Sequence, residues 1–246
     1  MKQAIFKIEN QIEIAPNVYK MTLAGDTSEI RNPGEFVDIL VPGKFLRRPI
    51  SVCDVSDGML TLIYKVVGAG TEILAGMEAG DELDILTGLG NGYDLSNERM
   101  GENPWIIGGG VGVPPMYLLA KRLIADGTIP KVVLGFNSEK EVFLEEEFKA
   151  LGCDVCVTTV DGLYGVKGFV TDAIDSDAYY FACGPEPMLK AVYRKINADG
   201  QMSFETRMGC GFGACMGCSV ETKNGYKRLC KEGPVLKKEE VTPWEG

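Results

Sequence analysis

The sequence contains no histidine, and it has fewer basic than acidic residues. Its 246 residues include 25 Lys and Arg against 35 Asp and Glu, for a net charge of −10. Such an acidic chain is a poor match for nucleic acid or for an anionic membrane surface. Without histidine, the usual proton shuttle at neutral pH is missing. Any catalysis should therefore use chemistry that needs no imidazole, such as hydride or electron transfer by a bound cofactor.

Long apolar runs are missing as well. No run of eighteen apolar residues occurs, so we expect no segment that spans a bilayer. Residues 1–9 alternate like a strand and hold no apolar core of signal-peptide length. We therefore expect a cytoplasmic protein outside any oxidising compartment. The length suits two domains with a small appendage.

Four cysteines near the C-terminus are the most informative residues present. Cys210, Cys215, Cys218 and Cys230 are spaced C-x4-C-x2-C-x11-C, and the first three lie in a Gly-rich run. This spacing is of the plant-ferredoxin type. Glycines accept positive φ and let backbone N–H groups approach sulfur. The pattern predicts a [2Fe–2S] cluster with these four cysteines as metal ligands.

Two other interpretations of the four cysteines stay open. Disulfides would require an oxidising compartment, which nothing in the sequence indicates. Structural zinc usually shows paired short C-x2-C knuckles or cysteine with histidine, and neither pattern is present. The remaining cysteines occur in apolar, strand-like segments and are expected to be buried small hydrophobes; they are Cys53, Cys153, Cys156 and Cys183.

The pattern of apolar residues divides the chain into three domains, 1–98, 99–200 and 201–246. The first has short alternating segments between turns, typical of an antiparallel barrel or sandwich. The second alternates apolar strands with helical stretches, typical of a doubly wound parallel α/β sheet. The third holds the cysteines. The expected strands of the first two domains are 3–9, 18–24, 36–41, 59–66, 105–108, 131–136, 154–160 and 179–183, and the expected helices are 72–75, 116–124, 145–151 and 187–198.

Two motifs predict a dinucleotide site on the second domain. The glycine-rich run 108–115, with Gly110, Gly112 and Pro115, lies between an expected strand and a helix. Glycines there let the backbone approach a pyrophosphate at the helix N-terminus. A second run, Cys183-Gly184-Pro185, occupies an equivalent strand end. A simple tight turn and a Pro-initiated helix without ligand are the alternatives.

The first domain holds an extended basic patch in an otherwise acidic protein. It includes Arg48-Pro49-Ile50-Ser51, in which the guanidinium can bind a diphosphate and the hydroxyl can add a hydrogen bond. Downstream, Ile63-Tyr64-Lys65 precedes a Gly-x-Gly-Thr run with Gly70 and Thr71, which could cap the helix expected at 72–75 over phosphate.

These motifs together resemble the ferredoxin–NADP reductase superfamily. Arg48-Pro49-Ile50-Ser51 is similar to its flavin motif, Gly110-x-Gly112-x-x-Pro115 to its pyridine-nucleotide loop, and Cys183-Gly184-Pro185 to its C-G-P element. With the cysteine segment added, the chain resembles the electron-transfer subunits of dihydroorotate dehydrogenase B. The resemblance implies a flavin barrel, a nucleotide domain and a [2Fe–2S] tail. It also implies FAD contacts at 48–51, 63–65, Gly70 and Thr71.

The resemblance further implies a function in de novo pyrimidine (UMP) biosynthesis. A partner subunit with FMN would oxidise dihydroorotate to orotate, and electrons would pass through the cluster and FAD to NAD. We expect a heterotetramer with two copies of each subunit, and no catalytic residue for orotate chemistry in this chain. Phe212, Ala214 and Met216 are the expected contacts with the partner, and packing on this chain's own barrel is the alternative. The net acidic stretch 137–141 favours NAD over NADP.

Two alternative functions remain at this stage. One is the reductase subunit of an NAD(P)H–ferredoxin, electron-bifurcating oxidoreductase, which has the same three domains. The other is a zinc-stabilised interaction module on a nucleotide-binding domain.

Overall fold

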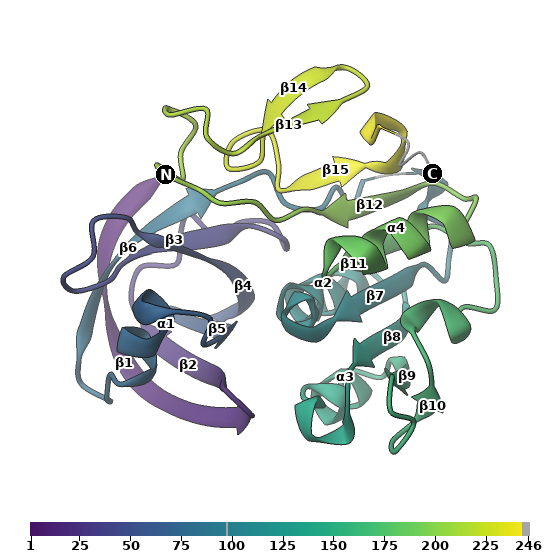
Figure 1. The fold of residues 1–246 in the computed structure, drawn as a ribbon, viewed down its shortest axis with the longest axis horizontal. Helices are drawn as coiled ribbons and strands as arrows, with labels where there is room; N and C mark the ends of the chain where they lie inside the picture. The colour runs from purple at the N-terminus through teal and green to yellow at the C-terminus, as the bar shows by residue number, and fades with distance from the viewer. Residues whose placement is uncertain (97, 243–246) are drawn as a thin grey trace.

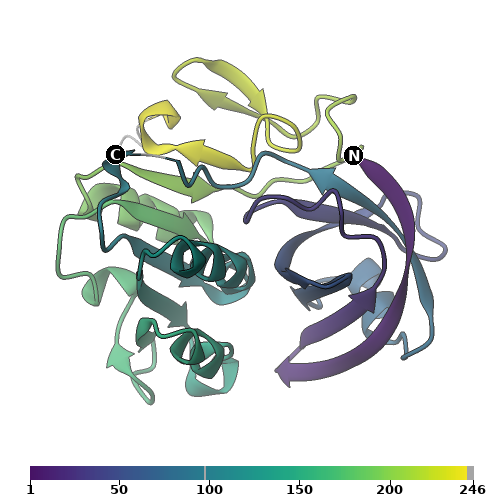
Figure 2. The ribbon, with the colours of Figure 1, turned by 180° about the vertical axis from the view of Figure 1, so that it is seen from behind.

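The computed structural model describes residues 1–96 and 98–242, which form a barrel, an open sheet covered by helices, and a C-terminal segment. Figure 1 shows the barrel on the left and the helix-covered sheet on the right, with the C-terminal segment lying across the top of both. Figure 2, from behind, shows the same bridging position of that segment.

The first part is a closed antiparallel barrel with strand order β1-β2-β5-β4-β3-β6. Its strands show period-two burial; in β6, for example, every second side chain from Leu83 to Leu89 is buried. The inward side chains, among them Phe6, Ile8 and Met21, form a core inside the barrel. The elements are β1 (Lys2–Ala15), β2 (Val18–Ala24), β3 (Phe36–Leu40), β4 (Arg48–Ser56), β5 (Met59–Lys65), α1 (Ala69–Ala75) and β6 (Glu82–Leu89).

The second part is a seven-stranded sheet with order β10-β9-β8-β7-β11-β12-β15. All of its neighbouring strands are parallel except β12 and β15. Helices α2 and α3 pack on one face, while α4 and part of the C-terminal segment pack on the other. The elements are β7 (Trp105–Gly109), α2 (Val113–Ala125), β8 (Lys131–Phe136), α3 (Glu145–Ala150), β9 (Asp154–Thr159), β10 (Val166–Lys167), β11 (Tyr180–Cys183), α4 (Glu186–Lys195), β12 (Gly200–Ser203) and β15 (Val235–Lys237).

The C-terminal segment is interleaved with the second part. Strands β12 and β15 extend the sheet, and the chain between them carries the cysteines and the hairpin of β13 (Ser219–Thr222) and β14 (Gly225–Arg228). The expected boundary near residue 200 stays a prediction. Short 3-10 helices complete the described chain, at Glu98–Met100, Gly110–Gly112, Glu139–Glu141, Val170–Asp172 and Lys238–Glu240.

The expected fold class, a barrel followed by a doubly wound α/β domain and a C-terminal cluster segment, is confirmed. Strands β2 and β8 have the expected bounds. The sequence reasoning did not predict β6, and it treated the start of β4 only as an extended patch. Within the described residues, no helix is long and apolar enough to cross a membrane.

Candidate functional site

A cavity of about 300 Å³ lies where the barrel meets the second part. Every predicted flavin residue of 48–51 and 63–65 lines it, and so does Thr71. The first group comes from the start of β4 and the second from the end of β5, so adjacent barrel strands bring the two sequence runs together. The barrel therefore places the predicted flavin residues around one hollow.

Arg48 is held in place by its surroundings. Its guanidinium Nη1 donates to the carbonyl oxygen of Leu46 at 2.7 Å and to that of Arg47 at 3.2 Å. Gly70 packs directly against it, because a Cβ at Gly70 would overlap the Arg48 Nε. Gly70 thus serves the cavity by making room for the arginine rather than by lining the hollow itself.

Helix α1 begins one turn earlier than expected. The helix starts at Ala69 rather than Glu72, so Thr71 lies in its first turn and not before it. The Thr71 hydroxyl accepts hydrogen bonds from the backbone N–H groups of Val67 and Gly68, at 2.9 and 3.2 Å. These bonds satisfy donors at the helix N-terminus that would otherwise lack partners.

Tyr64 forms a fixed part of the barrel wall. Its hydroxyl donates to Gln11 Oε1 at 2.8 Å, and Gln11 in turn donates to the last carbonyl oxygens of α1. Burial raises the pKa of Tyr64, so its phenol stays neutral.

Several wall residues of this cavity had no signal in the sequence. They come from both ends of the C-terminal segment, from separate barrel positions and, for Val111, from the glycine-rich loop after β7, which only the fold brings together. They are Phe36, Val67, Val111, Ser203, Phe204, Glu205, Thr206, Met208 and Pro234.

A second cavity, of about 380 Å³, opens at the carboxyl ends of β7, β8 and β9. This is the edge at which open α/β sheets bind ligands. Of the predicted nucleotide residues, Gly110 and Pro185 line it. Other lining residues, not predicted as ligands, include Phe136, Thr158, Phe169 and Met188.

The remaining predicted nucleotide residues do not line the cavity but pack in the loops and elements behind it. Gly112 packs against the backbone of Cys183 and Gly184, where a Cβ would overlap the Cys183 carbonyl oxygen. Pro115 is buried in the first turns of α2, and Cys183 is buried at the end of β11. The two motifs thus meet, but most of their residues shape the loops rather than face the cavity.

The acidic stretch after β8 also reaches this cavity. Asn137 and Glu141 both line it, and Asn137 Nδ2 donates to Glu141 Oε2 at 2.9 Å. An acidic group at this place suits a ribose diol better than a 2′-phosphate.

An ion pair joins the barrel to helix α2 of the second part. Lys121 Nζ on α2 donates to both carboxylate oxygens of Asp54 on β4, at 2.6 and 2.8 Å. Helix α2 follows the glycine-rich loop directly, and β4 begins at Arg48. The pair therefore links the element that follows the nucleotide loop to the strand that begins the flavin wall.

The four C-terminal cysteines form two pairs. Cys218 Sγ lies 3.2 Å from Cys230 Sγ, while Cys210 Sγ accepts the backbone N–H of Cys215 at 3.4 Å and also bonds to the Cys215 side chain. A separation of 3.2 Å is far longer than a disulfide bond, and all eight cysteines are free. Among residues 1–96 and 98–242, no three acidic, cysteine or histidine side chains converge to hold a single metal ion. Two separate thiol pairs fit a two-iron cluster better than one tetrahedral zinc.

Backbone geometry makes the loop fit an anionic group. Gly211, Gly213 and Met216 have positive φ, which turns the chain tightly around Cys210. Burial disfavours the Cys210 thiolate, but N–H groups of Cys215, Phe212 and Ala214 outweigh it and lower the Cys210 pKa. The loop thus stabilises negative charge on sulfur before any metal is present.

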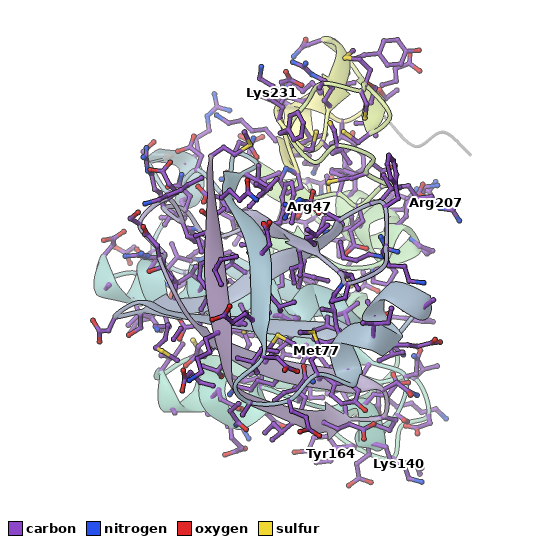
Figure 3. The ribbon with its side chains drawn as sticks, turned by 90° about the vertical axis from the view of Figure 1, so that its left-hand side faces the viewer. Arg47, Met77, Lys140, Tyr164, Arg207 and Lys231 are labelled. Carbon is purple, nitrogen blue, oxygen red and sulfur yellow. The ribbon has the colours of Figure 1, made fainter. Side chains whose placement is uncertain are left out.

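Phe36 connects the two sites. It lines the flavin-side cavity, and it also belongs to the apolar cluster that contains Cys218 and Cys230. Pro234, four residues beyond Cys230, lines the same cavity. In Figure 3, Arg47 lies on the side of the barrel that faces the C-terminal segment, whose Lys231 is at the top. The cysteine pair and the predicted flavin cavity therefore share a wall.

Two family models match parts of this chain. Residues 205–242 match the model of the iron–sulfur cluster binding domain of dihydroorotate dehydrogenase B, and residues 106–194 match that of the oxidoreductase NAD-binding domain. A solved structure of the NADH-dependent reduced ferredoxin–NADP oxidoreductase, described for flavin-based electron bifurcation, has a TM-score of 0.86 and 30% identity. That likeness covers 97% of this chain and 90% of the other.

Curated relatives match over nearly the whole length. The dihydroorotate dehydrogenase B (NAD(+)) electron transfer subunit of Bacillus pumilus is 44% identical, covering 98% of each chain. That of Fusobacterium nucleatum is 43% identical, covering 93% of this chain and 94% of the relative. On this similarity, the chain belongs to the family of electron transfer subunits of dihydroorotate dehydrogenase B.

Proposed function

We propose that this chain passes electrons between a dihydroorotate-oxidising partner subunit and NAD, through a [2Fe–2S] cluster and FAD, in the synthesis of pyrimidine nucleotides. The observation that carries the proposal is the wall that the Cys218–Cys230 pair shares, through Phe36 and Pro234, with the cavity lined by residues 48–51 and 63–65. This wall supports a site for single-electron transfer next to a site for a two-electron cofactor. Bound FAD would supply the conversion between one-electron and two-electron transfer.

Each group of residues has its own task in this proposal. Arg48 would hold the diphosphate of FAD, and the walls from β4 and β5 would orient its ring system. The loop at Gly110 and the Pro185 turn would hold NAD over the carboxyl ends of the strands. Cys210 with Cys215, and Cys218 with Cys230, would each hold one iron.

The proposal includes a catalytic partner that carries out the orotate chemistry, for which we expect no catalytic residue in this chain. The family name supports a partner subunit. An FMN group in that partner, an assembly with two copies of each subunit, and a cytoplasmic location are further parts of the proposal.

A spectrum with chemical analysis tests the proposed function. The purified chain should show flavin and iron–sulfur absorption bands, with two irons and two sulfides per FAD, as a [2Fe–2S] cluster requires. Anaerobic NADH should bleach the flavin band. A colourless, zinc-containing protein would contradict the proposal and favour the interaction module.

The bifurcating reductase stays a second candidate, because the solved structure with the TM-score of 0.86 is of that kind. Partner identity separates the two. Oxidation of dihydroorotate with NAD⁺, after addition of the catalytic subunit, would be found only for the first.

A further inference from the structure

Strand β3 carries a buried carboxylate on its outer side. Val37 and Ile39 belong to the barrel core, whereas Phe36 belongs to the apolar cluster outside the barrel that also contains Cys218 and Cys230. Strand alternation places Asp38 on the same outer side as Phe36. Asp38 is nevertheless only 2% exposed.

The cluster loop covers this carboxylate. A Cβ at Gly211 would overlap Asp38 Oδ2, so the loop backbone lies directly on the aspartate. Gly211 follows Cys210, and its φ of +75° is in the region that favours glycine. The tight turn after the first cysteine thus fits over Asp38.

No hydrogen bond within the described chain accounts for this burial. Asp38 Oδ1 is fully buried and has no hydrogen-bond partner among the described residues. The nearby cation Arg47 does not bond to the Asp38 carboxylate. It donates to the backbone oxygens of Asp38 and Asp84, at 3.2 and 3.0 Å, and to the Asp84 carboxylate at 2.9 Å. A buried, unpaired carboxylate is costly, and such groups need an explanation.

The charged groups that affect the Asp38 carboxylate include the first cluster cysteine, Cys210. Burial raises the pKa of Asp38 to about 6, with Arg47 and Arg48 opposing the rise and Cys210 adding to it. Across the β3–β4 pair, the register partner of Asp38 is Pro49, which lines the flavin-side cavity and has no N–H to donate. Asp38 therefore lies between the loop that follows Cys210 and strand β4, which begins the wall of the predicted flavin cavity.

Resting on the function proposed above, we propose that Asp38 is a positioning residue whose carboxylate lowers the reduction potential of the [2Fe–2S] cluster. Negative charge near a cluster disfavours the added electron, because net charge is one of the factors that set such potentials. A lower potential makes the reduced cluster a better donor to FAD. Asp38 thereby favours electron flow toward NAD⁺ without taking or giving any electron itself.

A redox titration of the cluster, followed by electron paramagnetic resonance at mildly alkaline pH, tests this role. Asp38→Asn keeps the shape without the charge, and Asp38→Ala removes the whole group. Both should raise the midpoint potential of the cluster and shift the electron equilibrium with FAD about tenfold toward the cluster, which equals about 59 mV for one electron. Asp57→Asn, the same charge change in the turn at the far end of β4, should leave the potential unchanged.

The alternative outcomes are distinct. If both variants keep iron, sulfide and FAD but show the wild-type potential, the proposal is wrong. A shift in Asp38→Asn without one in Asp38→Ala would assign the effect to the new amide and overturn the charge argument. Loss of iron from both variants would make Asp38 a support for the loop and overturn the proposal as well. A wild-type chain without any cluster would instead contradict the proposed function.

Discussion

At the scale of single residues, two side chains test the proposed cofactor sites most directly. Arg48 is the predicted anchor of FAD, and its guanidinium already has two backbone partners beside the cavity. Arg48→Ala should lose charge-assisted hydrogen bonds worth about 1.5–3 kcal/mol each and weaken FAD binding by an order of magnitude or more. Fluorescence titration of the apoprotein with FAD measures this. Arg31→Ala, at an exposed arginine of the barrel, is the control. Equal affinity of the two variants would count against the site.

Cys215 is the exposed member of its thiol pair. Cys215→Ser should strip the cluster, because one iron would lose a thiolate ligand. Reduction of FAD by NADH should survive, since the barrel and the nucleotide cavity do not contain this residue. Iron and sulfide analysis gives the readout, and Cys156→Ser, outside the loop, should retain both. A full complement of iron in the Cys215 variant would refute the ligand assignment.

The sequence could suggest the residues of each motif, because motifs depend on local backbone chemistry. Cysteine spacing and the Arg48 run can be seen in a single segment. The same reasoning could not find Asp38 or Phe36, since each is a single residue whose role depends on a segment about 170 or more positions away. Nor could it show that Gly112 and Cys183 pack on each other rather than line the cavity.

At the scale of elements, helix α1 gives a matched pair of glycines. A Cβ at Gly70 would overlap Arg48 Nε, whereas a Cβ at Gly68 meets nothing within 4 Å. Gly70→Ala should displace the arginine and weaken FAD by about tenfold, while Gly68→Ala should bind FAD normally. Gly70 lies in the first turn of α1, where alanine favours the helix, and Gly68 is only its N-cap, so neither change should unfold α1. The same titration measures both, and equal affinities would show that Arg48 tolerates the displacement.

Strand bounds were predicted best where the apolar pattern of the sequence is unbroken. Strand β8 is a continuous apolar run in the sheet interior, and its bounds match the expectation. Strand β6 was not predicted, because its alternating residues are mixed with Thr87 and Gly88 and follow a turn signal. Helix α1 begins earlier in the chain than expected, because Gly70 is tolerated in its first turn and Gly68 at its N-cap, although glycine usually favours loops.

At the scale of the whole molecule, the Lys121–Asp54 pair should fix how the nucleotide domain faces the flavin. Lys121→Met should leave FAD and iron content unchanged and lower stability by about 1 kcal/mol or less, because the pair is partly exposed. The rate at which NADH reduces FAD, measured by stopped flow, should fall several-fold, because a small displacement of one reactant from the other slows the reaction. Lys131→Met, which removes an exposed pair within one domain, is the control. Equal rates in the two variants would show that other contacts set the geometry.

The partner surface also belongs to this scale. Phe212 is 46% exposed and Met216 is 55% exposed on the cluster loop, and Ala214 between them is exposed too. About half of the surface of Phe212 and of Met216 is thus left uncovered by this chain. A one-electron carrier must lie close to its acceptor, and exposed apolar groups around it are typical of an interface core.

Co-expression with an FMN-containing dihydroorotate dehydrogenase from the same genome tests this surface. The wild-type pair should co-purify and oxidise dihydroorotate with NAD⁺. Phe212→Glu with Met216→Glu should weaken the complex tenfold or more, because two desolvated apolar contacts become charges, yet NADH should still reduce FAD. Leu163→Glu, at a more exposed apolar position on the loop before β10 at the opposite end of the molecule, should leave the complex intact. Loss of the complex in both variants would mean that charge alone disturbs assembly. A wild-type pair that neither co-purifies nor oxidises dihydroorotate would leave the bifurcating reductase as the better explanation of the same three-part fold.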